Sequence, residues 1–185
     1  MDSIMQWARD LSLVESFWIF TLFFVIHEFE EWNIADFEGR HFSNLPPTHS
    51  SRNARAWIGV VCAIALVWVA AASIPGLPAA YIFLPAVYVA ILNALQHFYW
   101  SVRFRTPASG VVSAAFLIVP AGLYLVWRSL AEGHVASWYA ASLASVIVVG
   151  LWGTIRSGRV APPILAAIYG IGGCAVRLFQ GKKAG

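Results

Sequence analysis

Long apolar runs separated by short polar breaks fill most of this chain from residue 13 onward. The runs are continuous rather than alternating, which predicts helices and argues against the strands of a membrane β-barrel. A helix needs about 20 mainly apolar residues to cross a membrane, and the main runs approach that length. The pattern predicts five spanning helices, at about 13–32, 56–73, 79–102, 110–129 and 136–155.

A sixth apolar segment, residues 160–178, fits two descriptions. It begins with Pro162 and Pro163, holds Arg177 near its end and contains the sequence GIGG, whose small residues suit close helix packing. We therefore expect it either to span the membrane or to re-enter it or lie at the interface. Together these segments predict an all-α, polytopic transmembrane bundle, with the whole chain, residues 1–185, forming a single transmembrane domain.

The composition supports a membrane protein. Of the 185 residues, 59% are hydrophobic and only 11% are charged, whereas soluble domains carry roughly 25% charged residues. The lipid bilayer is thus the first predicted partner, and nothing in the charge pattern predicts binding to nucleic acid. Cys62 and Cys174 lie in different apolar runs and match no metal-ligand spacing, so we expect both to be packing residues.

The basic residues predict how the helices are oriented, because cytoplasmic loops collect Lys and Arg. If the N-terminus lies outside, the loops after the first, third and fifth helices face the cytoplasm and carry most of the arginines, namely Arg40, Arg52, Arg55, Arg103, Arg105, Arg156 and Arg159. The opposite side then holds Arg9 and Arg128, and the tail with Lys182 and Lys183 joins the cytoplasmic side only if segment 160–178 does not span. We expect a multi-pass protein of the cell's inner (plasma) membrane.

Polar residues concentrate where the first apolar run ends, in the stretch HEFEEWN at residues 27–33. On a helix, His27, Glu30 and Glu31 are related as i, i+3 and i+4 and share one face. An ionisable residue that faces lipid at mid-membrane costs at least about 2.5–3.5 kcal/mol, so this face is expected to point into the bundle. Glu28 points about 100° away. The alternative for Glu28, and for each of the other two glutamates, is that it is simply solvated at the helix exit.

A second polar stripe lies in the third helix, in the stretch NALQHFYW at residues 93–100. Asn93, Gln96 and His97 follow the same helical spacing, although Asn93 is alternatively a plain hydrogen-bonding residue between helices. The first and third helices cross the membrane in the same direction, and both stripes lie near the C-terminal ends. The two stripes are therefore expected at one depth, which predicts a pocket shared by their imidazoles and carboxylates.

The residue types in this pocket suit a metal ion. A histidine and a carboxylate from one helical turn, with a third ligand from another helix, can bind one Zn²⁺ or Fe²⁺ and leave a position open. We predict His27, Glu31 and His97 as the metal ligands. The predicted catalytic residues are Glu30 as general base, Glu31, and Asn93 as an orienting group. The stretch HEFEE also nearly matches the zinc motifs HExxH and HxxEH, with Glu31 in place of the last histidine.

Four further residues lie on the same predicted side. His41 and His49 in the loop after the first helix are reserve ligands, although a histidine in a loop is usually just solvated. Arg103 and Arg105 can bind a phosphate or carboxylate headgroup. We favour the simpler interpretation that these two arginines anchor the helix end on the cytoplasmic side.

Three short elements occur in order along the chain: H-x-x-E-E at His27, Glu30 and Glu31, N-x-x-x-H at Asn93 and His97, and Pro-x-x-Gly at Pro107 and Gly110. This set resembles the HXXEE family of small bacterial integral membrane proteins over roughly residues 15–130. The resemblance implies that the histidine and the asparagine found beyond the motif in that family correspond to His97 and Asn93. It implies no particular reaction. Glu28 falls at an open position of the family motif, which argues against an HExxH site with Glu28 as the base.

The sequence leaves three functional hypotheses. The first is an integral membrane, metal-dependent enzyme of the hydrolase type that acts on a lipophilic substrate at the cytoplasmic side. The second is a metal-free proton-transfer enzyme, an isomerase or cyclase of an isoprenoid or sterol-like molecule, in which crowding of Glu30 and Glu31 keeps one of them protonated. The third is a non-catalytic protein that binds a metal ion or solute. The middles of the second and fourth helices carry no charge, which argues against a complete transport pathway.

Overall fold

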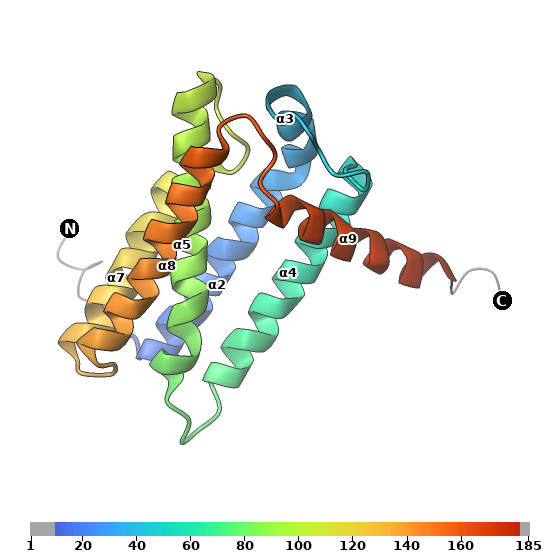
Figure 1. Cartoon of the computed structure of the whole chain (residues 1–185). Helices are drawn as coiled ribbons and strands as arrows, with labels where there is room; N and C mark the ends of the chain where they lie inside the picture. The colour runs from blue at the N-terminus through green and yellow to red at the C-terminus, as the bar shows by residue number, and fades with distance from the viewer. Residues whose placement is uncertain (1–9, 182–185) are drawn as a thin grey trace.

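The computed structural model describes residues 10–181, which form an all-helical bundle (Figure 1). Within this range there is no β-strand, and Ser43 and Val160 form an isolated bridge. The predicted all-α fold class is therefore confirmed. Arg9, Lys182 and Lys183, which entered the prediction of orientation, lie outside the described residues.

The main helices of the described range run up and down in alternation (Figure 1). They are α2 (Leu13–Glu30), α4 (Ser51–Ala72), α5 (Ala79–Phe104), α7 (Val119–Ala131) and α8 (Ser137–Ser157). The short α6 (Val111–Ser113) and a π-helical turn (Ala114–Ile118) lead directly into α7. α4 begins five residues earlier than the sequence predicts because Ser50 caps it, accepting a hydrogen bond from the backbone N–H of Asn53 at 3.2 Å.

Four helices are long and apolar enough to cross a membrane: α4, α5, the helix from Val111 to Ala131, and α8. α2 falls outside this set because its 18 residues include Glu15, Glu28 and Glu30. Its aromatic face is nevertheless packed inside the bundle, where Phe17 and Phe20 lie against Phe83 of α5 with ring centroids 4.5 Å and 6.2 Å away. By length and composition, the structure thus supports four of the five predicted spans and places the remaining helix among them.

The polar loop predicted at 33–55 contains a helix of its own. After a 3₁₀ turn (Glu31–Asn33), α3 (Ile34–His41) turns its apolar side toward the C-terminal end of α5. There Phe37 and Phe42 pack on the Trp100 ring, with centroids 6.5 Å and 5.5 Å away. These residues form a second apolar cluster, separate from the bundle core, and the polar residues at the end of α2 lie between the two.

The last helix, α9 (Ile164–Gly181), runs across the bundle instead of along it (Figure 1). It packs on α4, where Gly172 meets the backbone of Asn53 so closely that a larger side chain does not fit. Tyr169 of α9 is buried and donates a hydrogen bond to Glu38 of α3. For the sixth apolar segment, this orientation favours the interfacial or re-entrant alternative over a span parallel to the others.

Candidate metal centre

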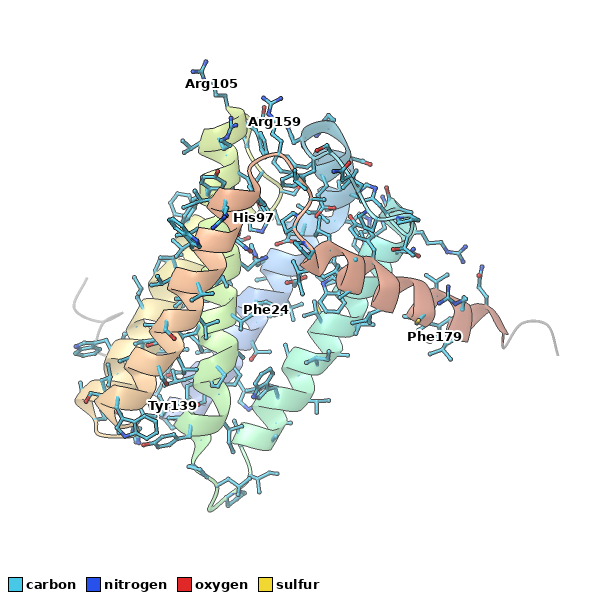
Figure 2. All side chains as sticks on the ribbon, in the orientation of Figure 1. Phe24, His97, Arg105, Tyr139, Arg159 and Phe179 are labelled. Carbon is cyan, nitrogen blue, oxygen red and sulfur yellow. The ribbon has the colours of Figure 1, made fainter. Side chains whose placement is uncertain are left out.

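Three buried side chains converge near the C-terminal ends of α2 and α5. Glu31 Oε1 lies 2.7 Å from His97 Nε2 and 3.1 Å from His27 Nε2, and the two imidazole rings meet edge to face with centroids 5.3 Å apart. Figure 2 shows His97 between the outer end of the bundle, marked by Arg105, and the deeper level of Phe24. One ligand atom from each of the three side chains lies within 4.8 Å of the others, so this buried group can hold a metal ion.

The contacts inside this group are close but poorly directed for hydrogen bonding. Glu31 Oε1 and both ring nitrogens of His97 are buried, and none of them makes a well-directed hydrogen bond to a described residue. Buried polar atoms are normally hydrogen-bonded, and an unsatisfied one costs about 1–3 kcal/mol. Two imidazoles and a carboxylate with unused lone pairs are a donor set that suits Zn²⁺ or Fe²⁺. The chemistry of the site therefore fits a divalent cation.

Ser113 and Asn93 hold the ring of His27 from opposite sides. His27 Nδ1 lies 2.8 Å from Ser113 Oγ, and His27 Nε2 lies 2.7 Å from Asn93 Oδ1. Ser113 Oγ can donate its own proton to the carbonyl oxygen of Gly110, which is 3.3 Å away. Asn93 Oδ1 only accepts, so without a metal His27 Nε2 carries a proton and donates it to Asn93. Binding of a metal through Nε2 requires the proton to move to Nδ1, where Ser113 Oγ can accept it. Asn93 thus lies where its predicted orienting role requires.

The contact of Ser113 with His27 was not predicted, and neither was the reason for a glycine at position 110. Gly110 has φ +87°, and a Cβ atom added to it would lie 2.9 Å from His27 Cε1 and 3.0 Å from Glu31 Cγ. Glycine is therefore required both by the backbone conformation and by the close approach of two candidate ligands. In the sequence, Pro107 and Gly110 stand out only as one of the three short elements, and nothing in the pattern around Ser113 points to the site.

Glu30 makes contacts outside the ligand group. Its carboxylate oxygens accept hydrogen bonds from the backbone N–H groups of Val112 at 3.1 Å and Ser113 at 2.7 Å. These N–H groups belong to the first turn of the helix that starts at Val111, where they have no partner within the helix. Glu30 therefore caps this helix and ties it to α2. The role of Glu30 as a general base stays a prediction. In the structure its carboxylate already accepts two hydrogen bonds.

Glu28 is buried, which excludes the alternative in which it is solvated at the helix exit. Its exposed fraction is only 6%, and it lines a cavity of about 100 Å³ together with Glu31, Asn93 and His97. The helical face 100° away from His27 is covered because α4 packs on that side of α2. The sequence of α2 alone does not indicate that α4 packs against it here. The pocket therefore holds a carboxylate, that of Glu28, which was not predicted to lie there.

A second polar group lines the same cavity from the side of α3 and α9. Glu38 is 3% exposed, accepts a hydrogen bond from the Tyr169 hydroxyl and lies 3.3 Å from His49 Nε2 through its Oε2 atom. Burial raises the pKa of Glu38 to about 7, the negative charge of Glu31 adds to the increase, and the hydrogen bond from Tyr169 partly opposes it. Burial also raises the pKa of Tyr169. None of these contacts was predicted, because they join three distant parts of the chain.

The remaining candidates lie away from the ligand group. His41 stacks on Phe104 with centroids 4.6 Å apart, and His49 contacts Glu38, so neither reserve ligand belongs to the three-residue group. Arg103 and Arg105 are exposed, and Figure 2 shows Arg105 pointing away from the end of α5. These two arginines therefore line no part of the cavity described above.

Comparison with known proteins gives one match. No curated protein and no solved structure matches this chain. A family model described as "Protein of unknown function with HXXEE motif" matches residues 18–125, which is more than half of the chain. This range includes the three candidate ligands as well as Asn93 and Gly110. The chain thus belongs to the HXXEE family, as the order and spacing of its motifs led us to expect.

Proposed function

We propose that this protein is a membrane-embedded, metal-dependent enzyme in which His27, Glu31 and His97 hold one Zn²⁺ or Fe²⁺ ion. The observation that carries the proposal is the buried approach of Glu31 Oε1 to His97 Nε2, 2.7 Å apart, with neither atom in a well-directed hydrogen bond. A shared cation satisfies both atoms at once, and His27 becomes the third ligand when its Nε2 gives up the proton that it shares with Asn93. Three protein ligands also leave a coordination position open for catalysis.

The surrounding residues supply what such a site needs besides its ligands. A divalent ion held by three protein ligands acts as a Lewis acid and makes water more acidic. Ser113 and Asn93 fix the orientation of the His27 ring. Glu28 brings a second carboxylate into the same cavity, and we assign it the role of proton acceptor, with Glu30 as the alternative. Glu28 is preferred because it lines the cavity, whereas Glu30 caps a helix.

Hydrolysis is the reaction type that this set of groups supports best. It needs a Lewis acid, a carboxylate to take the proton from water, and a cavity that limits access of bulk solvent. The four helices capable of crossing a membrane make lipid the surroundings of the site, so the proposed substrate is lipophilic. The exposed Arg103 and Arg105 follow His97 on the same helix, which supports a location at the cytoplasmic side of the membrane.

A metal-free proton-transfer enzyme is the second candidate, and one observation favours it. Glu31 Oε1 lies within 3.1 Å of one ring nitrogen from each histidine, so a carboxylate between two imidazoles can hold the local charge without an ion. With Glu28 as a further acid in the same cavity, the group can add and remove protons on an isoprenoid or sterol-like molecule. A protein that binds a metal without turnover is the third candidate, and it shares the metal-binding part of the first.

The metal content of the purified protein separates these candidates. The full chain is purified in a mild detergent, stripped with a chelator and titrated with Zn²⁺ and with Fe²⁺ under anaerobic conditions. We expect one ion per chain for the wild type and loss of binding in His27→Ala, Glu31→Gln and His97→Ala. His134→Ala is the matched control, because His134 is exposed and paired with Glu132 far from the site.

The outcomes of this titration differ for each hypothesis. Stoichiometric binding that is lost in the three site variants and kept in His134→Ala supports the metal site. If the wild type takes up neither ion, the metal proposal is abandoned in favour of proton transfer. Binding without any hydrolysis of short-chain and long-chain lipid esters favours the non-catalytic protein.

A further inference from the structure

A second, apolar cavity lies next to the polar cavity along one seam of the bundle, which α2, α4 and α5 line. α5 shows this arrangement most fully, because the residues that line the two cavities recur every three or four positions and so occupy a single helical face. From the apolar to the polar end they are Phe83, Ala86, Ala90, Asn93 and His97. The two cavities, each of about 100 Å³, are therefore successive parts of one seam rather than unrelated hollows.

α2 and α4 close this seam with the same regularity. On α2, Phe20 and Phe24 line the apolar cavity, and Glu28, one turn later, lines the polar one. On α4, which runs in the opposite direction, Ala65 lines the apolar cavity and Ile58, about two turns earlier, lines the polar one. On each of the three helices, residues that line the apolar cavity and residues that line the polar cavity are only about one or two turns apart. The same three helices thus line both parts of the seam, one apolar and one polar.

The two halves differ sharply in polarity. In the apolar half, Thr21 is the one hydroxyl-bearing residue, and its hydroxyl donates to the Phe17 carbonyl oxygen at 2.9 Å, so it offers no free donor. The polar half is lined by Glu28, Glu31, Glu38, Asn93, Gln96 and His97 among others. No Lys or Arg of the described chain lines it, so an anionic group meets carboxylates without a compensating basic side chain. An uncharged, oxygen-bearing group is the better match.

The length of the apolar half of the seam matches the thickness of one leaflet of a bilayer. Phe83 and Asn93 are ten residues apart on α5, which corresponds to about 15 Å at the rise of an α-helix, or half of a hydrocarbon core of about 30 Å. Trp68 marks the deep end, where its indole N–H donates to the carbonyl oxygen of Ile82 at 2.7 Å. The apolar half is therefore about as long as the hydrocarbon chain of a lipid in one leaflet.

The seam also opens toward the surrounding lipid between α4 and α5. Ile64 and Val89 line the apolar half and remain 46% and 55% exposed. α4 buries only four of its 22 residues, whereas α5 buries ten of 26. α4 is accordingly the less buried of the two helices that border this opening.

We propose that this seam binds a single-chain, uncharged amphiphile, with its headgroup in the polar cavity beside His97 and its hydrocarbon chain in the apolar cavity beside Phe24. This inference deepens the proposed function by naming the class of substrate, and it rests on that function only for what happens to the headgroup. A monoacylglycerol has the required chemistry, because its ester and hydroxyl oxygens suit the polar half and its acyl chain suits the apolar half.

Photolabelling tests the location of the chain. The full-length protein in lipid nanodiscs is exposed to a monoacylglycerol that carries a photoreactive group near the end of its acyl chain, and the labelled residues are mapped by mass spectrometry. We expect labelling of α2, α4 and α5 around Phe24, Ala65 and Ala86. Competition by unlabelled long-chain monoacylglycerol is expected, with little competition by a short-chain one. Labelling spread evenly over the lipid-facing surface overturns the proposal.

Filling the apolar cavity tests its contribution to affinity. Ala65→Phe and Ala86→Phe add a ring from two different helices at half-buried positions, and Ala141→Phe on an exposed position of α8 is the matched control. We expect the first two variants to bind the long-chain monoacylglycerol at least about tenfold more weakly, because each excluded methylene group contributes severalfold to affinity. Cooperative thermal unfolding with a midpoint no lower than that of the wild type shows that the fold of each variant is intact. Equal affinity in all three variants overturns the proposal.

Metal removal distinguishes this proposal from the proposed function. If the dependence on chain length persists after chelation in a protein that binds no metal, the amphiphile site stands and the metal-dependent enzyme fails. If zinc binds with one ion per chain but affinity is the same for long and short acyl chains, the metal site stands and the amphiphile site fails.

Discussion

Gly110 lies so close to His27 that no side chain fits between them. A Cβ atom on Gly110 would lie 2.9 Å from His27 Cε1. The same glycine has a left-handed backbone conformation, with φ +87°. This contact links the Pro-x-x-Gly element to the H-x-x-E-E element, which are separated by about eighty residues of sequence. It explains in physical terms why both occur in one site, since the turn before α6 forms a wall of the candidate metal centre.

Replacing Gly110 by alanine tests this contact. The left-handed backbone alone costs about 1–2 kcal/mol for a residue with a side chain. Displacement of His27 and Glu31 by the new methyl group adds about 1–3 kcal/mol. Gly133→Ala is the control, because Gly133 also has a positive φ, +72°, but open space around it. Thermal unfolding and zinc titration of both variants are expected to show a larger loss of stability in Gly110→Ala and a loss of metal affinity in that variant alone. Equal losses contradict the contact.

Metal binding is expected to stabilise the folded protein. A ligand that binds only the folded form adds about 2.7 kcal/mol when its free concentration is 100 times its Kd. The unfolding midpoint of the chelated wild type should therefore rise as Zn²⁺ is added, and it should not rise in Glu31→Gln. His134→Ala should respond as the wild type does. A midpoint that rises equally in Glu31→Gln places the bound ion elsewhere.

Glu28 and Glu30 are expected to separate into two roles. Glu30→Ala removes the acceptor for two N–H groups of the first turn after Val111, which costs about 1 kcal/mol of stability and leaves zinc affinity nearly unchanged. Glu28→Gln removes a carboxylate from the cavity beside the ligands, which should weaken zinc binding by about tenfold without loss of stability in the metal-free protein. Unfolding curves and zinc isotherms of the two variants measure both effects. The reverse assignment, with Glu30 controlling zinc affinity, would restore it as the general base.

Glu38 makes stability depend on pH. Its pKa in the folded protein is about 7, whereas the ordinary value is 4.5, so the folded form holds a proton that the unfolded form releases. The contribution of Glu38 to stability is therefore greatest below about pH 4.5 and falls as the pH rises to about 7, by at most about 3 kcal/mol. Glu38→Gln is expected to flatten this fall. Tyr169→Phe removes a hydrogen bond that lowers the pKa, and it should move the fall to higher pH. Unfolding midpoints measured between pH 4 and pH 9 that are identical for the wild type and Glu38→Gln would contradict the assignment.

The all-helical fold and the meeting of three candidate ligands were predictable from the sequence. Apolar runs of nearly membrane-spanning length predict helices whatever their neighbours are. The spacing of His27 and Glu31 places them on one helical face, and the shared direction of two helices places His97 at the same depth. Both arguments depend only on the geometry of individual helices and on the order in which they cross the membrane.

The burial of Glu28 and the caps and contacts made by more distant segments were not predictable in this way. Glu28 lies on a helical face that looks exposed until α4 covers it, and Glu30 lies on the predicted face but bonds to the start of another helix. Ser113 and Tyr169 reach the site from segments with no periodic pattern that singles them out. Their positions depend on which helices are neighbours.

The sequence by itself determined which segments are helical, which faces of α2 and α5 are polar, and that His27, Glu31 and His97 lie at one level. Only the tertiary structure decided that the site has a wall at Gly110, a second carboxylate at Glu28 and an apolar extension toward Phe24. The physical reason is that periodicity is a property of one helix, whereas a cavity is formed by the packing of several. Hydrophobic packing between helices has no direction of its own, so the shapes of the contacting side chains select the neighbours.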